Sequence, residues 1–257
     1  MDAFQVFPVV GIPEVHPGDD LFTLITDALG KGPGLQPHDI LVITSKIVSK
    51  SEGQIFPSQT RDALIVEETV RIIAERGKTK IVETRHGLIM AAAGVDASNA
   101  PAGTVLKLPE DSDRSARELR KKLHTLASPI GVIITDTMGR AWRLGLTDNA
   151  IGVAGVRTLI DYRGLHDDAG RTLELTVTAA ADEIASTAEL VKGKLDGIPV
   201  VLIRGLSRYV IADDGPGSIS LVRSREEDMF ALGSELAEQQ GYLRGFEDGK
   251  RAVAKSD

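Results

Sequence analysis

Short apolar runs recur along the chain, and segments with helical spacing of apolar residues lie between them. This alternation predicts a mixed α/β (α+β) protein. Several runs are continuously apolar, as expected for strands of a sheet that is covered on both faces. The predicted strands are Ile40–Thr44, Lys80–Glu83, Thr104–Leu108, Gly131–Thr135, Thr172–Thr178 and Val200–Arg204.

The clearest predicted helix covers Asp113–Leu126, where apolar residues at three- and four-residue spacing form one stripe. Similar spacing predicts helices over Thr60–Glu75 and over the alanine-rich Ala179–Val191. The last of these ends near Gly193, a residue that favours the left-handed conformation of a helix cap.

No internal repeat or long low-complexity linker divides the sequence. A change of composition near Ala127–Pro129 would separate two lobes of one larger domain. The chain becomes strongly polar beyond Gly233. We therefore expect a domain over residues 1–233, followed over residues 234–257 by a polar tail that forms a final helix or a loosely held end.

Composition narrows the class of protein. A chain of 257 residues can bury a substantial core. Its net charge of -7 disfavours a nucleic-acid partner, which requires a basic surface. Because there is no cysteine, disulfides, zinc–thiolate sites and thiol catalysis are excluded. No signal peptide is visible and no apolar run approaches the roughly 20 residues that span a bilayer. We expect a cytoplasmic protein that has no membrane partner.

The segment from Ile133 to Arg143 carries the strongest chemical signal. A predicted strand leads directly into Asp136 and Thr137, whose oxygen atoms suit Mg²⁺ or Mn²⁺. Arg140 and Arg143 would bind phosphate or carboxylate oxygens. The same pattern also fits an Asp turn with arginines that face solvent. Spacing alone does not decide between these interpretations.

Two further segments are candidates for the same site. Asp96 and Asn99 follow a stretch of small residues, and would bind a cation and a base or ribose, or would simply form an Asx turn. Lys46 and Lys50 follow the predicted strand Ile40–Thr44. If a helix begins there, the two lysines share one face and Ser45 caps the helix, which would form an anion site. Surface lysines are the alternative.

The remaining candidates are weaker. The segment Gly11–Asp20 reads as a loop that leads into a helix capped by Asp19 or Asp20. Lys192 and Lys194 would stabilise the end of the predicted helix or contact phosphate. His86 is isolated, and a structural role is expected for it. The chain lacks the glycine-rich phosphate motifs of P-loop and dinucleotide-binding proteins, so a bound nucleotide would need another kind of site.

Taken together, these segments resemble the coenzyme F420:L-glutamate ligase (F420-0:gamma-glutamyl ligase) family, from Gly11 to about Gly233. The matching motifs are Gly11-Ile12-Pro13, Thr44-Ser45-Lys46-x-x-Ser49-Lys50, Arg85-His86-Gly87, Ala93-Gly94-Val95-Asp96-x-Ser98-Asn99, Thr135-Asp136-Thr137-x-Gly139-Arg140 and Val191-Lys192-Gly193-Lys194. Each motif is modest by itself, but their order is specific.

The resemblance implies a GTP-dependent ligase that adds L-glutamate to a coenzyme precursor and then extends the tail through γ-glutamyl links. It implies Mg²⁺ or Mn²⁺, often with a monovalent cation such as K⁺, and an intertwined homodimer. By matching position, Ile12, Pro13, Glu14, Val15, Ser45, Lys46, Lys50, Asn99, Gly193 and Lys194 would contact the nucleotide, while Asp96, Asp136 and Thr137 would hold the metals. The family pattern has Gln at the position of Lys194, and a protonated lysine is a poor metal ligand.

Amide formation from a carboxylate requires a better leaving group, which an acyl phosphate would supply. We therefore expect phosphoryl transfer from GTP to the precursor carboxylate, followed by attack of the glutamate amine, with release of GDP and phosphate. Two other hypotheses use the same residues. A metal-dependent nucleotide phosphohydrolase would need no amine acceptor, and a nucleotide-binding regulatory module would perform no chemistry.

Overall fold

A computed structural model describes residues 3–253 of the chain, which divide into two compact units at Leu221 and Val222. The first unit contains all the strands of the described chain, and the second contains the long C-terminal helix. The expected boundary after residue 233 lies within that helix and stays a prediction, as does the expected pair of lobes. No helix within residues 3–253 has the length and apolar character needed to cross a membrane.

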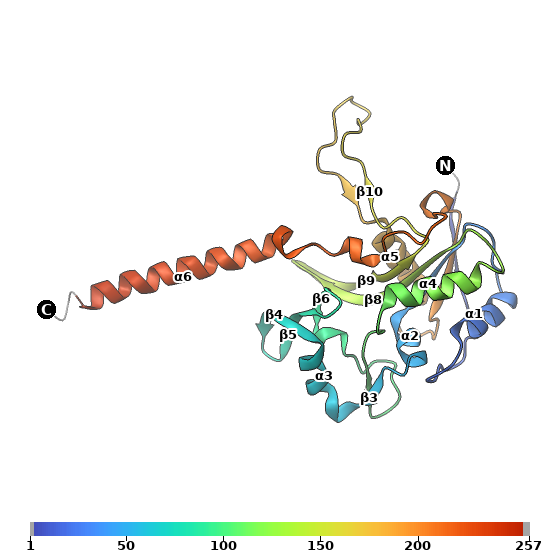
Figure 1. The fold of residues 1–257 in the computed structure, drawn as a ribbon, viewed down its shortest axis with the longest axis horizontal. Coiled ribbons are helices and arrows are strands. Elements are labelled where there is room, and N and C mark those ends of the chain that lie inside the picture. The colour runs from blue at the N-terminus through green and yellow to red at the C-terminus, as the bar shows by residue number, and fades with distance from the viewer. Residues whose placement is uncertain (1–2, 254–257) are drawn as a thin grey trace. The chain divides into compact units, whose positions relative to one another are not determined.

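A five-stranded sheet in the order β1-β12-β2-β8-β9 forms the centre of the first unit (Figure 1). Its strands are β1 (Gln5–Pro8), β12 (Val200–Arg204), β2 (Ile40–Thr44), β8 (Gly131–Arg140) and β9 (Arg143–Ala154). Strands β2 and β8 run parallel, and the other neighbouring pairs are antiparallel. Parallel strands end at the same edge of a sheet, so the residues that follow β2 lie beside the outer half of β8.

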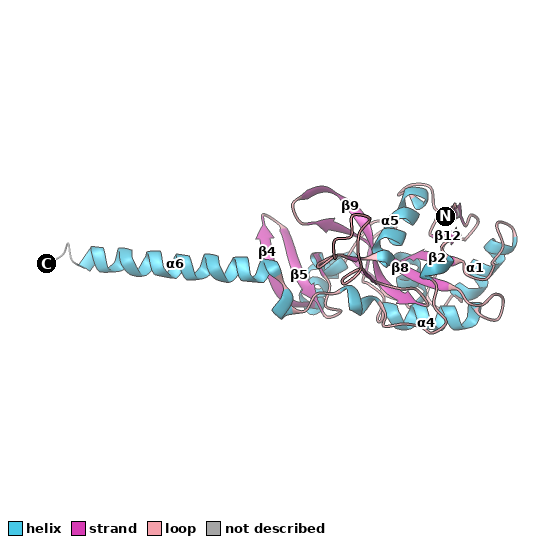
Figure 2. Ribbon diagram, turned by 90° about the horizontal axis from the view of Figure 1, so that it is seen from above, coloured by secondary structure: helices cyan, strands magenta, loops and turns pink. Residues whose placement is uncertain are grey.

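Helices cover both faces of this sheet, as Figure 2 shows for α4 (Ser112–Leu123) and α5 (Ala180–Lys192). Alternate strand residues point to opposite faces. Leu41 and Ile43 therefore pack in one core with α4 and α1 (Leu21–Gly30), whereas Ile40 and Val42 pack in the other with α5. The expected mixed α/β class is confirmed, and continuous apolar strands do mark a sheet that is buried on both sides.

Smaller elements surround the central sheet. Three strands form a separate sheet, β4 (Thr69–Arg76), β5 (Thr79–Thr84) and β6 (Ile89–Ala91). Two hydrogen-bonded pairs are β3 (Ile55–Pro57) with β7 (Thr104–Leu106), and β10 (Ile160–Asp161) with β11 (Val177–Thr178). The remaining helices of the first unit are α2 (Ser45–Ser51), α3 (Arg61–Glu68) and the 3-10 turns η1 (Ser58–Thr60), η2 (Ala92–Gly94), η3 (Ser207–Tyr209) and η4 (Ser218–Leu221).

Three sequence predictions about these elements are wrong in part. The helix predicted over Thr60–Glu75 ends at Glu68, because the β-branched residues that follow form β4 and pair with β5. Only the last two residues of the predicted strand Thr172–Thr178 form a strand. The strand predicted to end at Thr135 continues to Arg140 as one arm of a hairpin with β9. Asp136 therefore lies within a strand and not at its end.

The second unit consists of a 3-10 turn, η5 (Arg225–Glu227), and α6 (Met229–Val253). For the polar tail, the sequence predicts either a final helix or a loosely held end. The helix is present, although it begins before residue 234. Within it, the rings of Tyr242 and Phe246 stack with 6.3 Å between their centroids, and the Lys250 ammonium lies 4.4 Å from the centroid of the Phe246 ring.

Candidate active site

The first unit contains a cavity of about 1240 Å³. Its wall is formed by segments that are far apart in the sequence: the loop before α1, helix α2, the loop after β6, the outer part of the β8–β9 hairpin, and the end of α5 with the loop that follows. Pockets for single drug-sized ligands usually have about 300–1,000 Å³. This cavity therefore has room for a nucleotide together with a second substrate.

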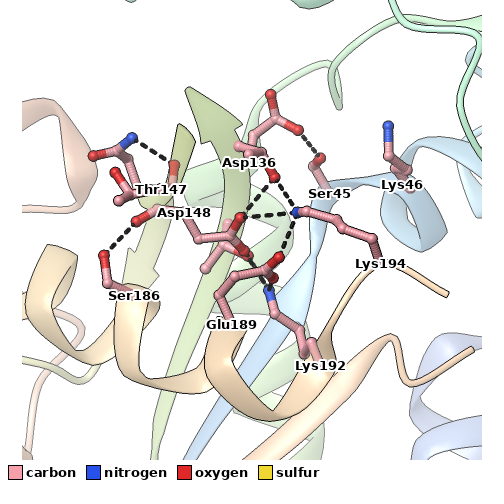
Figure 3. Close-up of polar contacts among 12 residues, drawn as sticks. Ser45, Lys46, Asp136, Thr147, Asp148, Ser186, Glu189, Lys192 and Lys194 are labelled. Carbon is pink, nitrogen blue, oxygen red and sulfur yellow. Dashed lines mark hydrogen bonds and ion pairs between the residues drawn. The ribbon is translucent and has the colours of Figure 1, made fainter. Parts of the chain in front are cut away.

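Asp136 enters the cavity from β8. The register of the parallel strands pairs Thr44 with Thr135, so Ser45 at the start of α2 lies beside Asp136. The Ser45 hydroxyl donates a 2.9 Å hydrogen bond to Asp136 Oδ1 (Figure 3). Ser45 is itself buried and does not form part of the cavity wall. The expectation that Ser45 caps α2 is wrong. Thr44 is the N-cap residue and its side chain makes no capping bond, while the Ser45 hydroxyl donates to Asp136.

Burial raises the pKa of Asp136 to about 6, although the nearby Lys46 charge and the Ser45 hydrogen bond act in the opposite direction. Two further carboxylates, Asp148 and Asp96, contribute to the increase by repulsion. A nearby cation stabilises the charged form of such a buried carboxylate. Asp136 is thus charged at neutral pH and is placed to bind a positive group.

Asp96 reaches the cavity from the loop after η2. The Ser98 backbone amide donates a 2.9 Å hydrogen bond to Asp96 Oδ1, which is the Asx turn expected from the sequence. Asp96 and Asn99 nevertheless line the cavity, so the turn and a binding role coexist. Burial opposes ionisation of Asp96, but hydrogen bonds from Lys46 and Ser98 hold its pKa below the usual range.

Lys46 and Lys50 lie on α2 and both face the cavity, as their spacing predicts. The Lys46 ammonium forms an ion pair with Asp96. Lys50 is buried, and its ammonium lies 2.5 Å from Glu14 Oε1. The site thus brings two ammonium groups to one wall, where each is neutralised by a carboxylate from another segment.

Two loops complete the wall with residues that the family resemblance assigns to nucleotide binding. Ile12, Pro13, Glu14 and Val15 line the cavity from the loop before α1. That loop leads into α1 with Asp20 at the N-cap position, as expected, although the Asp20 side chain makes no capping bond to the helix backbone.

Gly193 and Lys194 line the cavity at the end of α5. Gly193 has a φ of 58°, and a β-carbon there would lie 2.6 Å from Asp196 Oδ2, so both conformation and space favour glycine. The Lys194 ammonium donates a 2.7 Å hydrogen bond to Thr137 Oγ1 and lies 2.5 Å from Glu189 Oε1.

The structure does not bring Arg140 and Arg143 to this cavity. They are exposed cross-strand neighbours at the turn of the β8–β9 hairpin, and neither lines the wall. The Arg140 guanidinium donates instead to the Leu144 carbonyl at 3.1 Å. Because β8 continues beyond Thr135, the two arginines lie at the far end of the hairpin. The expectation that they act beside Asp136 is therefore not met in the cavity of a single chain.

His86 and Arg85 also lie outside the cavity wall. His86 Nε2 is 3.1 Å from the Pro109 carbonyl, in keeping with the structural role expected for it. Burial lowers the pKa of His86. Arg85 bridges Glu68 and Glu110, with Nε 2.5 Å from Glu68 Oε2. This part of the family motif joins the end of β5 to α3 and to the segment before α4, outside the cavity wall.

Two site residues, Asp148 and Glu189, are not predicted from the sequence. Asp148 on β9 and Lys192 at the end of α5 form a buried ion pair, and Glu189 lies beside them. All three line the cavity. For Lys192 the sequence predicts a helix-end charge or a phosphate contact, whereas the structure places it in a buried ion pair. An acidic residue at i−3 from a lysine is a weak sequence signal, and nothing in the sequence around Asp148 marks it as a partner.

The donors at Asp96, Asp136 and Thr137 are hard oxygens, which suit Mg²⁺ or Mn²⁺. Within residues 3–253, no group of three or more His, Cys, Asp or Glu side chains is arranged to hold a metal ion. Divalent ions here would therefore rest on the carboxylates of Asp96 and Asp136 and, on the opposite side of β8, on the Thr137 hydroxyl, together with oxygens of the substrate. Mg²⁺ is commonly bound in this way, through one or two carboxylates and substrate phosphates. The residues present fit such an ion.

Fold and site together define a mixed α/β protein with a large cavity, lined by carboxylates and lysines, that suits phosphate chemistry. The chain belongs to the F420-0:gamma-glutamyl ligase family, a family of ligases, whose model matches residues 10–205.

Similar proteins bear out this membership. The coenzyme F420:L-glutamate ligase of Methanopyrus kandleri is 41% identical over 252 residues, which cover 90% of this chain and 98% of the relative. The proteins of the same name from Archaeoglobus fulgidus and Methanothermobacter thermautotrophicus are 39% and 40% identical, and the alignments cover 95% and 96% of those relatives and 88% and 86% of this chain.

Proposed function

We propose that this protein joins L-glutamate to the carboxylate of a coenzyme F420 precursor (F420-0), with GTP as the energy source, and then extends the γ-linked glutamate tail. The relatives are coenzyme F420:L-glutamate ligases, which supports the amide-forming ligation. GTP, the acyl-phosphate route and the tail extension come from the family resemblance and from the chemistry of the cavity.

The observation that carries the proposal is the composition of one cavity wall. Asp96 and Asp136 come from separate segments and face the same space as Lys46 and Lys50. A site that transfers a phosphoryl group needs cations for the phosphate oxygens and carboxylates for a metal ion, in one place and with room for both substrates. The cavity of about 1240 Å³ meets these requirements.

In the proposed reaction, a carboxylate oxygen of the precursor attacks the γ-phosphorus of GTP. A bond from that oxygen to phosphorus forms, the bond between the γ-phosphorus and the bridging oxygen breaks, and GDP leaves. The glutamate amine then attacks the acyl carbon, loses a proton, and displaces inorganic phosphate. Lys46 and Lys50 supply donors for the phosphate oxygens. The loop from Ile12 to Val15 and Asn99 would contact the nucleoside.

Asp96, Asp136 and Thr137 would hold Mg²⁺ or Mn²⁺. When bound, the ion offsets negative charge on the phosphoryl group during transfer. The Ser45 hydroxyl keeps Asp136 directed into the cavity. Lys194 contributes a positive charge next to Thr137. K⁺ would act as a further cation of the reaction.

A homodimer is also part of the proposal. The β8–β9 hairpin carries Trp142, Leu144 and Leu146, which are 88%, 98% and 66% exposed in the single chain. Such an apolar group on one arm favours association with a second copy. Light scattering should give twice the mass of one chain, and Leu144→Asp should reduce the measured mass.

We place this biosynthetic reaction in the cytoplasm.

An assay with GTP, Mn²⁺, L-glutamate and the glutamate-free precursor tests the activity. Mass spectrometry should find the precursor increased by glutamate, with one GDP released for each bond. GDP without an adduct would identify a nucleotide phosphohydrolase and overturn the proposal. Nucleotide binding with neither product would identify a binding module. The same assay with ATP in place of GTP tests the nucleotide preference. The assay in K⁺-free buffer tests the requirement for K⁺.

A further inference from the structure

Three buried side chains meet next to Asp136, and two of them, Asp148 and Lys192, also line the cavity. Asp148 on β9, Lys192 on α5 and Thr135 on β8 are 2%, 3% and 0% exposed. The Lys192 ammonium forms an ion pair with Asp148 (Figure 3). It also donates a 2.7 Å hydrogen bond to Thr135 Oγ1. The Thr135 hydroxyl in turn donates to Asp148 Oδ2 at 2.8 Å. Each member of this cluster therefore bonds to the other two.

The second oxygen of Asp148 extends the cluster to Thr137. Thr137 is the cross-strand partner of Asp148, and its hydroxyl donates to Asp148 Oδ1 at 2.7 Å. Asp148 thus holds the residues on both sides of Asp136. Because alternate residues of a strand point to opposite faces, the two threonines are held from the α5 side while Asp136 projects toward Ser45 on the other.

The backbone at this point needs such support. The pairing of β8 with β9 shifts by one residue between Ile134 and Thr135, which leaves Ile151 as an extra residue on β9. A bulge of this kind interrupts the ladder of backbone hydrogen bonds and changes the direction of side chains. Side-chain bonds from Asp148 and Lys192 therefore hold β8 where its backbone pairing is irregular.

Lys192 is poorly placed to act on a substrate directly. Its side chain is 3% exposed, and its ammonium already contacts Thr135 and Asp148, with Glu189 Oε2 at 3.5 Å. A buried lysine of this kind is retained only with a charged partner. Lys194, whose side chain is 56% exposed, is the more accessible of the two lysines that line the cavity at the end of α5.

We propose that the Asp148–Lys192 pair is a positioning device that fixes Thr135 and Thr137, and thereby sets the direction of Asp136 and Thr137 for binding the divalent cation. This inference rests on the proposed function for its effect on turnover. Its effect on cation binding is independent of that function. Outer partners of metal ligands usually contribute about 10–100-fold to metal affinity or activity.

The test compares Mn²⁺ binding, KM for GTP and kcat in a double variant, Asp148→Asn with Lys192→Met, which removes both charges together. A matched control is Asp161→Asn with Arg163→Met, because that pair has a 2.6 Å contact but is exposed. We expect Mn²⁺ affinity and kcat of the first variant to fall about ten-fold or more. KM for GTP should change less than two-fold, and the control should match the wild type.

A folded double variant with wild-type Mn²⁺ affinity would overturn the inference, as would a wild-type protein that binds no Mn²⁺. If the double variant fails to fold, Thr135→Val decides. It keeps the charge pair and the side-chain shape but removes one hydroxyl, so Mn²⁺ affinity should fall about five-fold. Because Asp148 and Lys192 each lose one buried hydrogen-bond partner, the thermal midpoint should also fall by a few degrees while the protein stays folded. Unchanged affinity in a folded Thr135→Val protein would refute the positioning role. A wild type that binds Mn²⁺ but forms no glutamate adduct refutes the proposed function alone.

Discussion

The hydroxyl of Ser45 donates a 2.9 Å hydrogen bond to Asp136 Oδ1 across 91 residues of sequence. The bond exists because β2 and β8 are parallel neighbours, with Thr44 paired to Thr135. The first residue of α2 is therefore beside the residue that β8 presents to the cavity. Asp136 is oriented by another element as well as by its own strand, which is the arrangement that a precise cation site requires.

Asp136→Asn should retain the fold and lose metal-dependent turnover by at least about 100-fold, at the upper end of the loss seen for outer partners. Because the pKa of Asp136 is raised to about 6 from 3.8, the folded state binds more protons at this group than the unfolded state between those values. The carboxylate charge therefore opposes folding above pH 6. The thermal midpoint at pH 7.5 should be equal or higher in the variant.

Asp168→Asn is the matched control, since Asp168 is exposed in the loop between β10 and β11. It should leave turnover and midpoint unchanged. Full activity of Asp136→Asn at saturating Mn²⁺ would contradict the role of Asp136.

Mn²⁺ binding should weaken as the pH falls below about 6. A proton and a cation compete for Asp136, whose pKa burial raises to about 6. Affinity should therefore be nearly constant from pH 7 to 8 and decrease by up to about ten-fold per unit well below the pKa. Electron paramagnetic resonance of free Mn²⁺ measures this directly. A wild-type profile that stays flat down to pH 5 would argue against Asp136 as a ligand.

Lys46→Met should move that profile to higher pH. The Lys46 charge lowers the pKa of Asp136 and so partly offsets the effect of burial. Without the ammonium, Asp136 should protonate at a higher pH and Asp96 should lose its ion-pair partner. KM for GTP should also rise, because a phosphate donor is lost. Lys78→Met, on the exposed turn between β4 and β5, serves as the control. An unchanged pH profile would show that Lys46 does not act on Asp136.

Lys194→Gln should increase the affinity for divalent cations. Burial by itself would lower the pKa of Lys194, but the hydrogen bond to Glu189 and the nearby carboxylates raise it, so the group is charged at neutral pH. Its ammonium contacts Thr137 and repels a cation there. An amide removes that charge and offers an oxygen ligand. Calorimetric titration with Mn²⁺ checks the direction, and weaker binding would assign Lys194 to the support of Thr137 instead.

Glu68→Gln should destabilise the protein at neutral pH by about 3 kcal/mol, the lower end of the cost of breaking a buried ion pair. Burial opposes ionisation of Glu68, but hydrogen bonds from Lys107 and Arg85 hold its pKa below the ordinary 4.5. The stabilisation is therefore present above that value and is lost as the pH falls through the folded-state pKa.

Denaturant unfolding at pH 7 and pH 3 measures the difference, which should shrink at the lower pH. Glu67→Gln is the neighbouring control, because Glu67 is 64% exposed and 3.3 Å from Lys107. If the two substitutions destabilise the protein equally, the buried ion pairs of Glu68 do not stabilise the protein more than the exposed contact of Glu67.

The sequence predicts the parts of this molecule in which one local signal dominates. Strands β2 and β12 have the predicted bounds, Ile40–Thr44 and Val200–Arg204, because continuous apolar runs admit few alternatives. The helix over Thr60–Glu75 fails after Glu68, since its apolar spacing fits a helix while its β-branched residues favour a strand. Only pairing with β5 decides between them.

The residues of the candidate site also divide into those that local sequence signals predict and those that depend on the fold. Of the residues assigned by the family resemblance, Ile12–Val15, Lys46, Lys50, Asp96, Asn99 and Asp136 do line one cavity, as do Thr137, Gly193 and Lys194. Arg140 and Arg143 do not, because the length of β8 cannot be read from an apolar run that ends at Thr135. Asp148 and Lys192 meet across 44 residues at a bulge. No local pattern encodes that pairing.

The order of the central sheet also has a consequence for synthesis. Strand β12 lies between β1 and β2, so within residues 3–253 the N-terminal strand β1 pairs with β12 alone, near residue 204. The chain leaves the ribosome N-terminus first, at roughly 5–20 residues per second. Until β12 emerges, the nascent chain therefore exposes one bare edge of β2 and an unpaired β1, and both are open to pairing with other chains. Chaperone binding to stalled nascent chains should thus persist until β12 has left the exit tunnel and then decline.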